Sequence, residues 1–252
     1  MPVQPDTHVE APGAGGKVLE LDAVNADRGP AHVLRGVSLL VRAGETVCLV
    51  GRNGAGKTTV MESIIGTLPV TSGRVVFKGQ EVMRLGPHVR ARLGMGYAPD
   101  DCGIFPDLTV AENLGIGAWL AGGKSGSSQE DGDAAIYELF PKLRLLLQRK
   151  GVHLSGGEKK MVAIARSMAL RPSILLLDEA FEGLAPVIVN RFAEAVQQIK
   201  EMGISLLIAE SNVMTAAKVA DRLYVIDRGE IIFEGPPAAV FDDERVMQTI
   251  RG

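Results

Sequence analysis

The chain has 252 residues, 46% of them hydrophobic, which is enough for one large domain or two small ones with a sizeable core. Its net charge of −3 gives no overall electrostatic reason to expect a nucleic-acid partner. The N-terminus has no signal-peptide core, and no apolar run approaches the ~18 residues of a membrane-spanning helix, so we expect any membrane role to act through a partner.

The first part of the chain predicts a tail followed by strands. Residues 1–17 contain prolines and acids without an apolar pattern, which predicts a disordered tail. Three short apolar stretches predict a β-rich lobe: 18–23, 37–41 and 73–77. The continuously apolar Thr46–Val50 predicts a buried strand, and 58–65 predicts a helix that ends at Gly66.

The middle of the chain predicts helices. Thr109 and Glu112 have the spacing of a capping box, which marks the start of a helix. Two further stretches have helix-like patterns: 134–140 and 159–170. Residues 122–133 are rich in glycine, serine and acids, and they predict an exposed, mobile loop. We expect a helical subdomain inserted into a core lobe: 99–169 within 18–98 and 170–252.

After Pro172, strand-like and helix-like segments alternate, as expected for a parallel sheet with covering helices. In chain order they are 174–177, 187–202, 205–209, 213–220 and 222–226. Arg228 and Gly229 then predict a hairpin turn into a last strand at 231–233. The predicted fold class is α/β.

Residues 51–58 fill every fixed position of the G-x-x-x-x-G-K-[ST] phosphate-binding loop. The glycines let successive backbone N–H groups turn toward a phosphate, Lys57 supplies a positive charge, and Thr58 can hold Mg²⁺. The alternative is a glycine-rich turn with an incidental lysine, which the flanking strand and helix disfavour. The loop therefore indicates a nucleotide.

The apolar stretch 174–177 ends in two carboxylates, Asp178 and Glu179, which is a Walker B pattern. Doubly wound sheets place ligands at the C-terminal ends of their strands, so Asp178 can face Mg²⁺ while Glu179 faces an attacking water. The alternative is a buried strand that ends at a solvated acidic turn. The phosphate-binding loop in the same chain favours the catalytic interpretation.

The sequence Leu-Ser-Gly-Gly-Glu at 154–158 is the third motif. Ser155 and Glu158 have the spacing of a capping box, so these residues can simply begin a helix. A helix N-terminus whose N–H groups are left bare by Gly156 and Gly157, beside one hydroxyl, is also an anion site. Both interpretations can hold together.

These motifs resemble the ATP-binding subunits of ABC transporters, for which Leu-Ser-Gly-Gly-Glu is the signature. The resemblance runs from about residue 18 to the end, and it implies a P-loop NTPase (RecA-like) core with an antiparallel β lobe and a helical insertion that contains the signature. Four shorter matches resemble the branched-chain amino-acid and amide importer branch, as the shorter of its two paired ATPases: 97–100, 105–114, 137–141 and 183–186.

The resemblance implies two subunits facing head to tail, with ATP and Mg²⁺ between the loop of one and the signature of the other. The catalytic residues would be Lys57, Asp178 and Glu179. Mg²⁺ would be held by Thr58, Asp178 and Asp100. The nucleotide would contact Gly51, Asn53, Gly54, Ala55, Gly56, Lys57, Thr58, Thr59, Arg28, Asp100 and Ser211, and from the partner's side Ser155, Gly156 and Gly157.

Three positions depart from the usual family pattern. Arg28 stands near the place of an aromatic that stacks on adenine; a guanidinium can stack too, or it can be a plain solvated side chain. Asp100, after a strand at 95–98, replaces a glutamine and can still ligate Mg²⁺. Ser211 replaces the switch histidine and is too short to reach a γ-phosphate. Losing one positioned donor typically costs about 10²- to 10³-fold in rate, so we expect a slow ATPase.

The resemblance implies an ATPase subunit that energises an importer of branched-chain or other polar amino acids or amides. Its expected partners are a second ABC ATPase, identical or a paralogue, transmembrane permease subunits that contact 100–108, and indirectly an external binding protein. Its expected place is peripheral, on the cytoplasmic face of the inner membrane. The alternative is a nucleotide-binding partner or regulatory subunit with impaired hydrolysis. A soluble ABC protein of DNA repair or translation is disfavoured, because the chain has neither a long coiled coil nor a second ATPase unit.

Overall fold

The computed structural model describes residues 15–120, 134–184 and 186–251. The loop expected at 122–133 and most of the tail expected at 1–17 lie outside this described part. Lys17 is already the first residue of a strand, so regular structure begins one residue earlier than the expected boundary at residue 18. Within the described residues no helix is long and apolar enough to cross a membrane.

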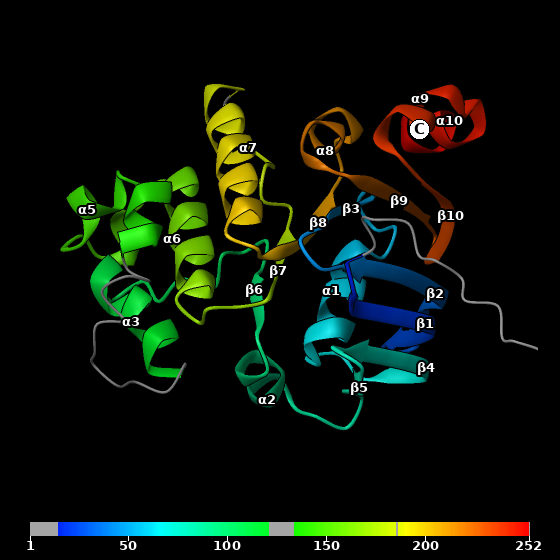
Figure 1. The fold of residues 1–252 in the computed structure, drawn as a ribbon, viewed down its shortest axis with the longest axis horizontal. Helices are drawn as coiled ribbons and strands as arrows, with labels where there is room; N and C mark the ends of the chain where they lie inside the picture. The colour runs from blue at the N-terminus through cyan, green and yellow to red at the C-terminus, as the bar shows by residue number, and fades with distance from the viewer. Residues whose placement is uncertain (1–14, 121–133, 185, 252) are drawn as a thin grey trace, which may run out of the picture.

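Four strands near the N-terminus form an antiparallel sheet in the order β2-β1-β4-β5 (Figure 1). They are β1 (Lys17–Arg28), β2 (Ala31–Arg42), β4 (Val70–Phe77) and β5 (Gln80–Glu81). In β1, Leu19 pairs with Val41 and Phe77 on its two neighbours, and all three side chains are buried. The predicted β-rich lobe is therefore present, with β1 and β2 longer than their apolar patterns because a tight turn with Gly29 at φ +61° joins them directly.

A second, six-stranded sheet has the order β10-β9-β3-β8-β7-β6. Its strands are β3 (Thr46–Val50), β6 (Met95–Ala98), β7 (Ile174–Asp178), β8 (Ser205–Glu210), β9 (Arg222–Asp227) and β10 (Glu230–Gly235). The first five run parallel, and β10 pairs antiparallel with β9. Every residue of β3, β7 and β8 is buried, as expected for strands covered on both faces. The predicted α/β class is confirmed.

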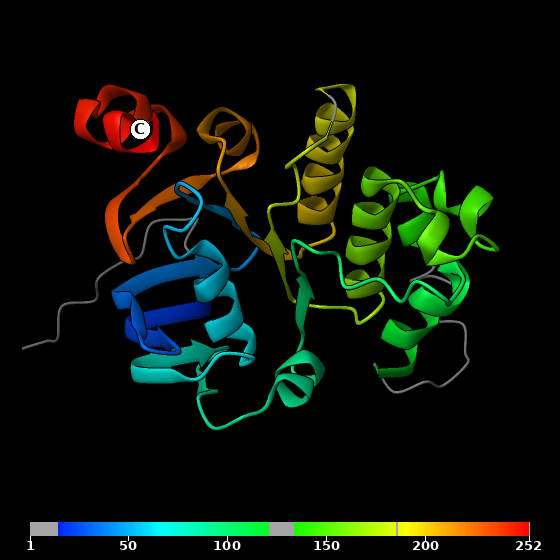
Figure 2. The same cartoon turned by 180° about the vertical axis from the view of Figure 1, so that it is seen from behind.

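The two faces of the parallel sheet belong to two separate cores. In β3 the side chains alternate: Val47 and Leu49 pack with the antiparallel sheet and helix α1 (Lys57–Ile65), whereas Cys48 and Val50 pack with the helices on the other face. This alternation follows from the period of two along a strand. Helix α1 lies between the two sheets, and the opposite face is covered by α6 (Gly156–Met168), α7 (Pro186–Glu201) and α8 (Val213–Val219) (Figures 1 and 2).

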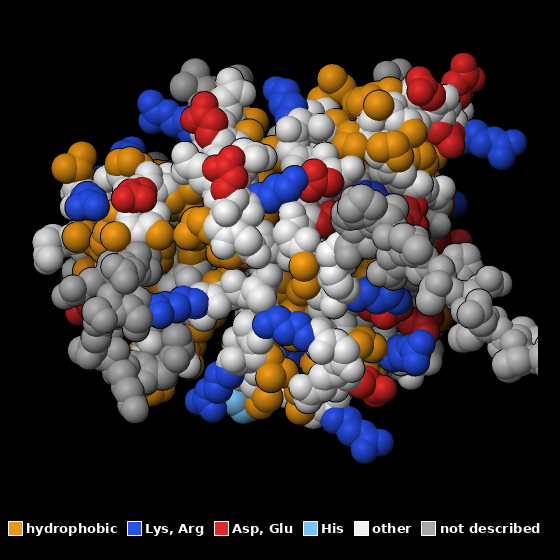
Figure 3. Space-filling view, viewed as in Figure 1, with side chains coloured by type: hydrophobic (Ala, Val, Ile, Leu, Met, Phe, Trp, Pro, Cys, Tyr) orange, Lys and Arg blue, Asp and Glu red, His pale blue; other side chains and the backbone are white. Residues whose placement is uncertain are grey.

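The helices predicted from the sequence occur close to their expected places: α1 (Lys57–Ile65), α3 (Val110–Leu120), residues 134–139, α6 (Gly156–Met168), α7 (Pro186–Glu201) and α8 (Val213–Val219). Further helices and a 3₁₀ turn were not predicted: α2 (Pro87–Arg92), α5 (Leu143–Leu146), η1 (Gly151–His153), α9 (Pro237–Asp242) and α10 (Glu244–Arg251). We call α3, residues 134–139, α5, η1 and α6 the helical group. It lies beside the parallel sheet and away from the antiparallel one, and hydrophobic side chains gather on its surface (Figures 1 and 3).

Local signals at the ends of elements hold as predicted. Gly66 ends α1 in the left-handed conformation. Thr109 and Glu112 form the predicted capping box, since the Glu112 N–H donates to Thr109 Oγ1 at 3.2 Å and the Thr109 N–H donates to Glu112 Oε2 at 2.8 Å. The hairpin between β9 and β10 has positive φ at both Arg228 and Gly229, which matches a type I′ turn.

The short helix α2 was not predicted, because its six residues are too few for a clear hydrophobic period. The helix places the buried Arg90 at the C-terminus of α1, where its guanidinium donates to the carbonyls of Ser63 and Ile64 at 2.9 and 2.7 Å. A cation there satisfies carbonyls that have no partner within the helix. Tertiary contacts, not local pattern, position this element.

Candidate active site

The phosphate-binding loop, Asp178, Glu179, Asp100 and Ser211 meet at the C-terminal edge of the parallel sheet. The loop follows β3, Asp178 ends β7 and Glu179 comes directly after it, and Asp100 and Ser211 follow β6 and β8. A cavity of about 490 Å³ opens here. It is lined by Arg28, Val33, Asn53, Gly54, Gly56, Lys57, Thr58, Thr59, Asp100, Glu179 and Glu182.

The loop takes a conformation that its glycines permit. Gly54 and Gly56 have φ values of +83° and +114°. At Gly51 a Cβ atom would lie only 2.5 Å from the carbonyl oxygen of Ile226, so no larger residue fits without movement. Gly56 is also the N-cap of α1 and contributes no side chain there, which leaves the N–H groups of the first helical turn facing the cavity. The geometry suits an anion.

Lys57 is buried at the first position of α1, and its amine is fully bonded. Nζ donates to the carbonyl oxygens of Gly51 and Arg52 at 2.7 and 3.1 Å. It also lies 2.9 Å from Glu179 Oε1 in an ion pair whose side chains are only 4% and 7% exposed. The lysine of the phosphate loop and the last carboxylate of the Walker B strand thus neutralise each other.

Glu179 is held from several sides. Its backbone has φ +49°, and its N–H donates to the carbonyl of Ala209 at 2.9 Å. Its Oε2 accepts hydrogen bonds from both the N–H and the hydroxyl of Ser211, each at 3.2 Å. From α6, the Lys160 ammonium donates to the Glu179 carbonyl oxygen. The sequence showed only that Ser211 is short; its contact with Glu179 required the tertiary structure.

Asp178 is buried beside Thr58 and has one oxygen without a partner. Tyr97 donates to Oδ2 at 3.4 Å, whereas the buried Oδ1 has no hydrogen bond among the described residues. Burial raises the pKa of Asp178 to about 6, the hydroxyl of Thr58 acts against this rise, and the charges of Glu179 and Asp100 add to it. An unpartnered buried carboxylate oxygen beside a hydroxyl fits a hard cation such as Mg²⁺.

The cation would need ligands beyond these side chains. The described residues contain no group of three His, Cys, Asp or Glu side chains that could hold a metal ion. Mg²⁺ commonly keeps several waters and binds through one or two carboxylates plus substrate phosphates. Asp178, Thr58 and Asp100 are compatible with that kind of site.

Arg28 lies on the rim of the cavity, at the end of β1. Its guanidinium is paired with Glu62 of α1, and the side chains of the pair are 51% and 25% exposed. Both sequence-based interpretations of Arg28 remain compatible with this position, because the guanidinium borders the cavity and also contacts solvent. The structure adds Glu62 as the group that holds it.

Ser155, Gly156 and Gly157 do not line this cavity. They begin α6, where the capping box is present: the Ser155 N–H donates to Glu158 Oε2 at 2.9 Å and the Glu158 N–H donates to Ser155 Oγ at 3.4 Å. Hydrogen bonds from Lys142 and from the Ser155 backbone lower the pKa of Glu158 to about 2. The capping interpretation is thus confirmed, and the N-terminal turn of α6 carries no side chain at its two glycines.

Glu210 is a further buried acid that sequence reasoning missed. It is 1% exposed and ends β8. Its Oε1 accepts the N–H of Phe181 at 2.9 Å, and its carbonyl oxygen accepts the N–H of Gly51 at 3.2 Å. Burial raises its pKa to about 8, the hydrogen bond from Phe181 opposes this rise, and the charge of Glu179 adds to it. Glu210 therefore ties the segment after Glu179 to the start of the phosphate loop.

Known proteins resemble this chain in sequence and in fold. Residues 34–182 match the family model described as ABC transporter. The chain is 34% identical to the high-affinity branched-chain amino acid transport ATP-binding protein BraG of Pseudomonas aeruginosa, over 93% of this chain and 100% of that protein. It is 35% identical to the lipopolysaccharide export system ATP-binding protein LptB of Escherichia coli K12, over 88% of this chain and 91% of that one.

Solved structures agree with the sequence relatives. The ADP conformation of MJ1267, an ATP-binding cassette of an ABC transporter, superposes with a TM-score of 0.81 at 29% identity, covering 94% of this chain and 99% of that one. The chain belongs to the ABC transporter family, and it is an ATP-binding subunit that hydrolyses ATP to drive transport. The expected P-loop NTPase fold is confirmed. ABC ATPases act as dimers together with transmembrane permease components.

Proposed function

We propose that this subunit energises the import of branched-chain or other polar amino acids or amides. The likeness to BraG supports this cargo class, as does 31% identity to the probable branched-chain amino acid transport ATP-binding protein LivF of Archaeoglobus fulgidus, over 91% of this chain and 96% of that protein. LptB, which belongs to an export system, is equally similar. Direction and cargo therefore need a direct test.

The Lys57–Glu179 pair inside the cavity of the phosphate loop is the observation that carries the proposed catalysis. When ATP enters, its phosphates compete with Glu179 for the Lys57 ammonium. Lys57 then binds the β- and γ-phosphates together with the loop N–H groups of residues 51–59. Glu179, released from Lys57 and still bonded to Ser211, is free to accept a proton from the attacking water.

Thr58, Asp178 and Asp100 would hold Mg²⁺, which supplies positive charge against the phosphate oxygens when it is bound. The orphaned Oδ1 of Asp178 supports this assignment. Asp178 is the last residue of β7. The neighbouring strands β6 and β8 carry Tyr97 and Glu210. Ser211 contacts Glu179 but is too short to reach the γ-phosphate. We therefore expect hydrolysis to be slow but present.

Ser155, Gly156 and Gly157 would bind the nucleotide held by a second ATPase subunit, identical or a paralogue. None of the three lines the cavity of the phosphate loop in its own chain, and Ser155 and Gly157 line a different hollow of the surface, which supports this role. The bare N-terminal turn of α6 offers N–H groups to a phosphate. Each chain then contributes half of each composite site, and hydrolysis depends on association.

The permease subunits would contact residues 100–108, on the cytoplasmic face of the inner membrane. Phe105 supports this contact: its side chain is 48% exposed, and its ring lies 5.8 Å from the Arg166 guanidinium. Asn113 fixes the segment by bonding both the N–H and the carbonyl of Phe105, at 3.0 and 3.2 Å. Unchanged assembly of the complex after Phe105→Glu would count against this role.

The second candidate is a partner subunit that binds ATP but leaves most hydrolysis to a paralogue. The short Ser211 and the absent adenine-stacking aromatic favour it. ATPase assays of the isolated chain and of the chain with its co-purified partner separate the two candidates. A rate that rises on pairing but does not change with Glu179→Gln in this chain supports the partner role.

Identification of the proteins that co-purify with this chain from its native membrane tests the cargo proposal. We expect an amino-acid permease and a paired ATPase. The purified complex in vesicles should hydrolyse ATP faster when an amino-acid-loaded binding protein is added, and lipopolysaccharide should have no effect. Stimulation by lipopolysaccharide alone would replace the importer proposal with an exporter.

A further inference from the structure

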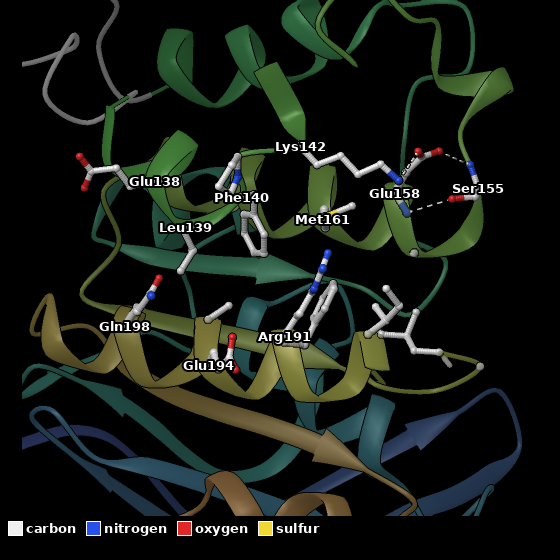
Figure 4. A pocket seen from close by; sticks show the side chains of 17 residues that line it. Glu138, Leu139, Phe140, Lys142, Ser155, Glu158, Met161, Arg191, Glu194 and Gln198 are labelled. Atoms are coloured by element: carbon white, nitrogen blue, oxygen red, sulfur yellow. Dashed lines mark hydrogen bonds and ion pairs between the residues drawn. The ribbon is translucent and has the colours of Figure 1, made fainter. Parts of the chain in front are cut away.

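A second cavity, of about 550 Å³, lies between α6, α7 and residues 138–142 (Figure 4). It shares no lining residue with the cavity of the phosphate loop. Its volume is within the range of small-molecule sites, ~300–1,000 Å³. Ser155 and Gly157, which we propose meet a partner's nucleotide, line one end of it, and the rest of the cavity has no part in the nucleotide chemistry proposed above.

The walls of this cavity are apolar and well supported. The ring centroids of Phe140 and Phe192 lie 6.0 Å apart. Both residues belong to the core on the face of the parallel sheet that α6, α7 and α8 cover. Four partly buried side chains pack on that core and complete the lining: Leu139, Met161, Leu184 and Ile188. A ligand with an apolar body would remove this surface from water.

The charges at the Ser155 end of the cavity are already compensated. Lys142 Nζ lies 2.9 Å from Glu158 Oε1, and Arg149 Nη1 lies 3.7 Å from Glu158 Oε2. Glu158 also accepts the N–H of Ser155. These groups satisfy one another and leave little charge for a ligand.

Arg191 is different. Its side chain rises from α7 into the middle of the cavity, toward Met161 (Figure 4). Within the described part of the chain, its guanidinium has no hydrogen bond or ion pair. Arg191 is exposed, so its guanidinium borders both the apolar lining and solvent. A guanidinium fork at such a place matches a carboxylate, which it can bind through two parallel hydrogen bonds.

A second charge stands one helical turn further along α7. Glu194 and Gln198 follow Arg191 at spacings that place all three on one face of the helix, and all three line the cavity. Glu194 and Arg191 do not form an ion pair with each other, although both are exposed on this face of α7. Glu138 also lines the cavity, but its carboxylate points away from the middle (Figure 4).

We propose that this cavity binds a small zwitterion with an apolar body, and specifically an apolar α-amino acid. Its carboxylate bonds Arg191, its ammonium group bonds Glu194, and its side chain packs against Phe140, Phe192 and their neighbours. A simple organic anion would use Arg191 but not Glu194, and a simple cation would use Glu194 but not Arg191, whereas a zwitterion uses both. This site is independent of the cargo proposed above.

Three matched probes test the charge pattern on the nucleotide-free chain: L-leucine, N-acetyl-L-leucine and L-leucinamide. The second lacks the ammonium charge and the third lacks the carboxylate. Titrations followed by saturation-transfer NMR give the dissociation constants without relying on ATPase activity. We expect leucine to bind at millimolar concentration or tighter, and each of the other two to bind about tenfold more weakly.

Variants assign the two charges. Arg191→Gln should weaken leucine about tenfold and remove its advantage over leucinamide, whereas Glu194→Gln should remove its advantage over N-acetyl-leucine. Arg245→Gln on α10 and Glu201→Gln at the end of α7 are matched controls outside the cavity and should bind leucine as the wild type does. The four substituted side chains are exposed, so the substitutions should not disturb the core. Circular dichroism verifies that each variant folds.

Three results would overturn the proposal. One is an absence of leucine binding at millimolar concentration, and another is equal affinity of the wild type for all three probes. The third is unchanged leucine affinity in Arg191→Gln. Because the readout is binding to the free chain, failure here leaves the importer proposal untouched, and failure of the importer proposal leaves this site untouched.

Discussion

Lys57 Nζ lies 2.9 Å from Glu179 Oε1, so the lysine of the phosphate-binding loop is paired with the acid proposed to activate water. Both side chains are nearly inaccessible to solvent. Two groups proposed to act in one reaction therefore bind each other. In the proposed mechanism a phosphate displaces the carboxylate from Lys57, so phosphate binding and release of the base would be one event.

Glu179→Gln should lower ATP hydrolysis by about 10²- to 10⁴-fold, because an amide cannot take a proton from water. ATP binding should persist, since the loop and Lys57 remain. The measurements are the turnover rate and the ATP dissociation constant of the paired complex. Equal turnover in the variant and the wild type would sink the proposed role of Glu179.

Lys57→Met should lower the free energy of unfolding of the nucleotide-free chain by about 3 kcal/mol, because it leaves the Glu179 carboxylate buried and unpaired. The double variant Lys57→Met/Glu179→Gln should recover much of this loss. Denaturant unfolding of the wild type, both single variants and the double variant measures the coupling. If the two losses simply add, the pair contributes nothing to stability.

Ser211→Ala should reduce turnover about fivefold to tenfold with little change in ATP affinity. The Oγ hydrogen bond to Glu179 is lost, whereas the Ser211 N–H still donates to the same oxygen, and one hydrogen bond to a charged group is worth ~1.5 kcal/mol. Ser211→Thr keeps the hydroxyl and is the matched control. A fall in ATP affinity without a fall in turnover would show that Ser211 contacts the nucleotide instead.

Arg28→Tyr should tighten ATP binding about tenfold, because stacking of an aromatic ring on a base is worth ~1–3 kcal/mol. In the wild type the guanidinium is engaged by Glu62. The matched control is Glu62→Gln, which releases Arg28 without adding a ring. Fluorescent-nucleotide titration measures both, and an affinity of Arg28→Tyr no better than that of the wild type would contradict an adenine position beside residue 28.

Stability should depend on pH through Glu210. Burial raises its pKa from 4.5 to about 8 in the folded chain, so the folded state holds a proton that the unfolded state releases between these values. The folded state therefore binds more protons, and stability falls as pH rises from about 4.5 through about 8, by on the order of 4 kcal/mol from this group.

Glu210→Gln should flatten that dependence, because glutamine can accept the Phe181 N–H without titrating. Unfolding free energies at several pH values between 5 and 8 measure the slope, with the exposed Glu230→Gln as control. An identical slope in the wild type and Glu210→Gln would show that Glu210 does not titrate in this range.

The sequence alone determined the fold class, the order of the motifs and the strands and helices that carry them. These features depend on local patterns: Thr46–Val50 is apolar throughout because it is covered on both faces, and Gly66 ends α1 because it adopts the left-handed conformation. The family resemblance, confirmed by the relatives, followed from the same spacing. The roles assigned to individual site residues stay predictions.

Only the tertiary structure decided which groups meet. Ser211 contacts Glu179 across 32 positions, and Arg28 contacts Glu62 across 34. Such pairs leave no periodic trace in a sequence, because neighbouring strands β7 and β8 bring the first pair together and the meeting of β1 with helix α1 brings the second. The sequence likewise showed no sign that Glu210 bonds the start of the phosphate loop or that Arg191 lines the second cavity. Local pattern determines where strands and loops occur, whereas burial and charge pairing depend on how those elements pack.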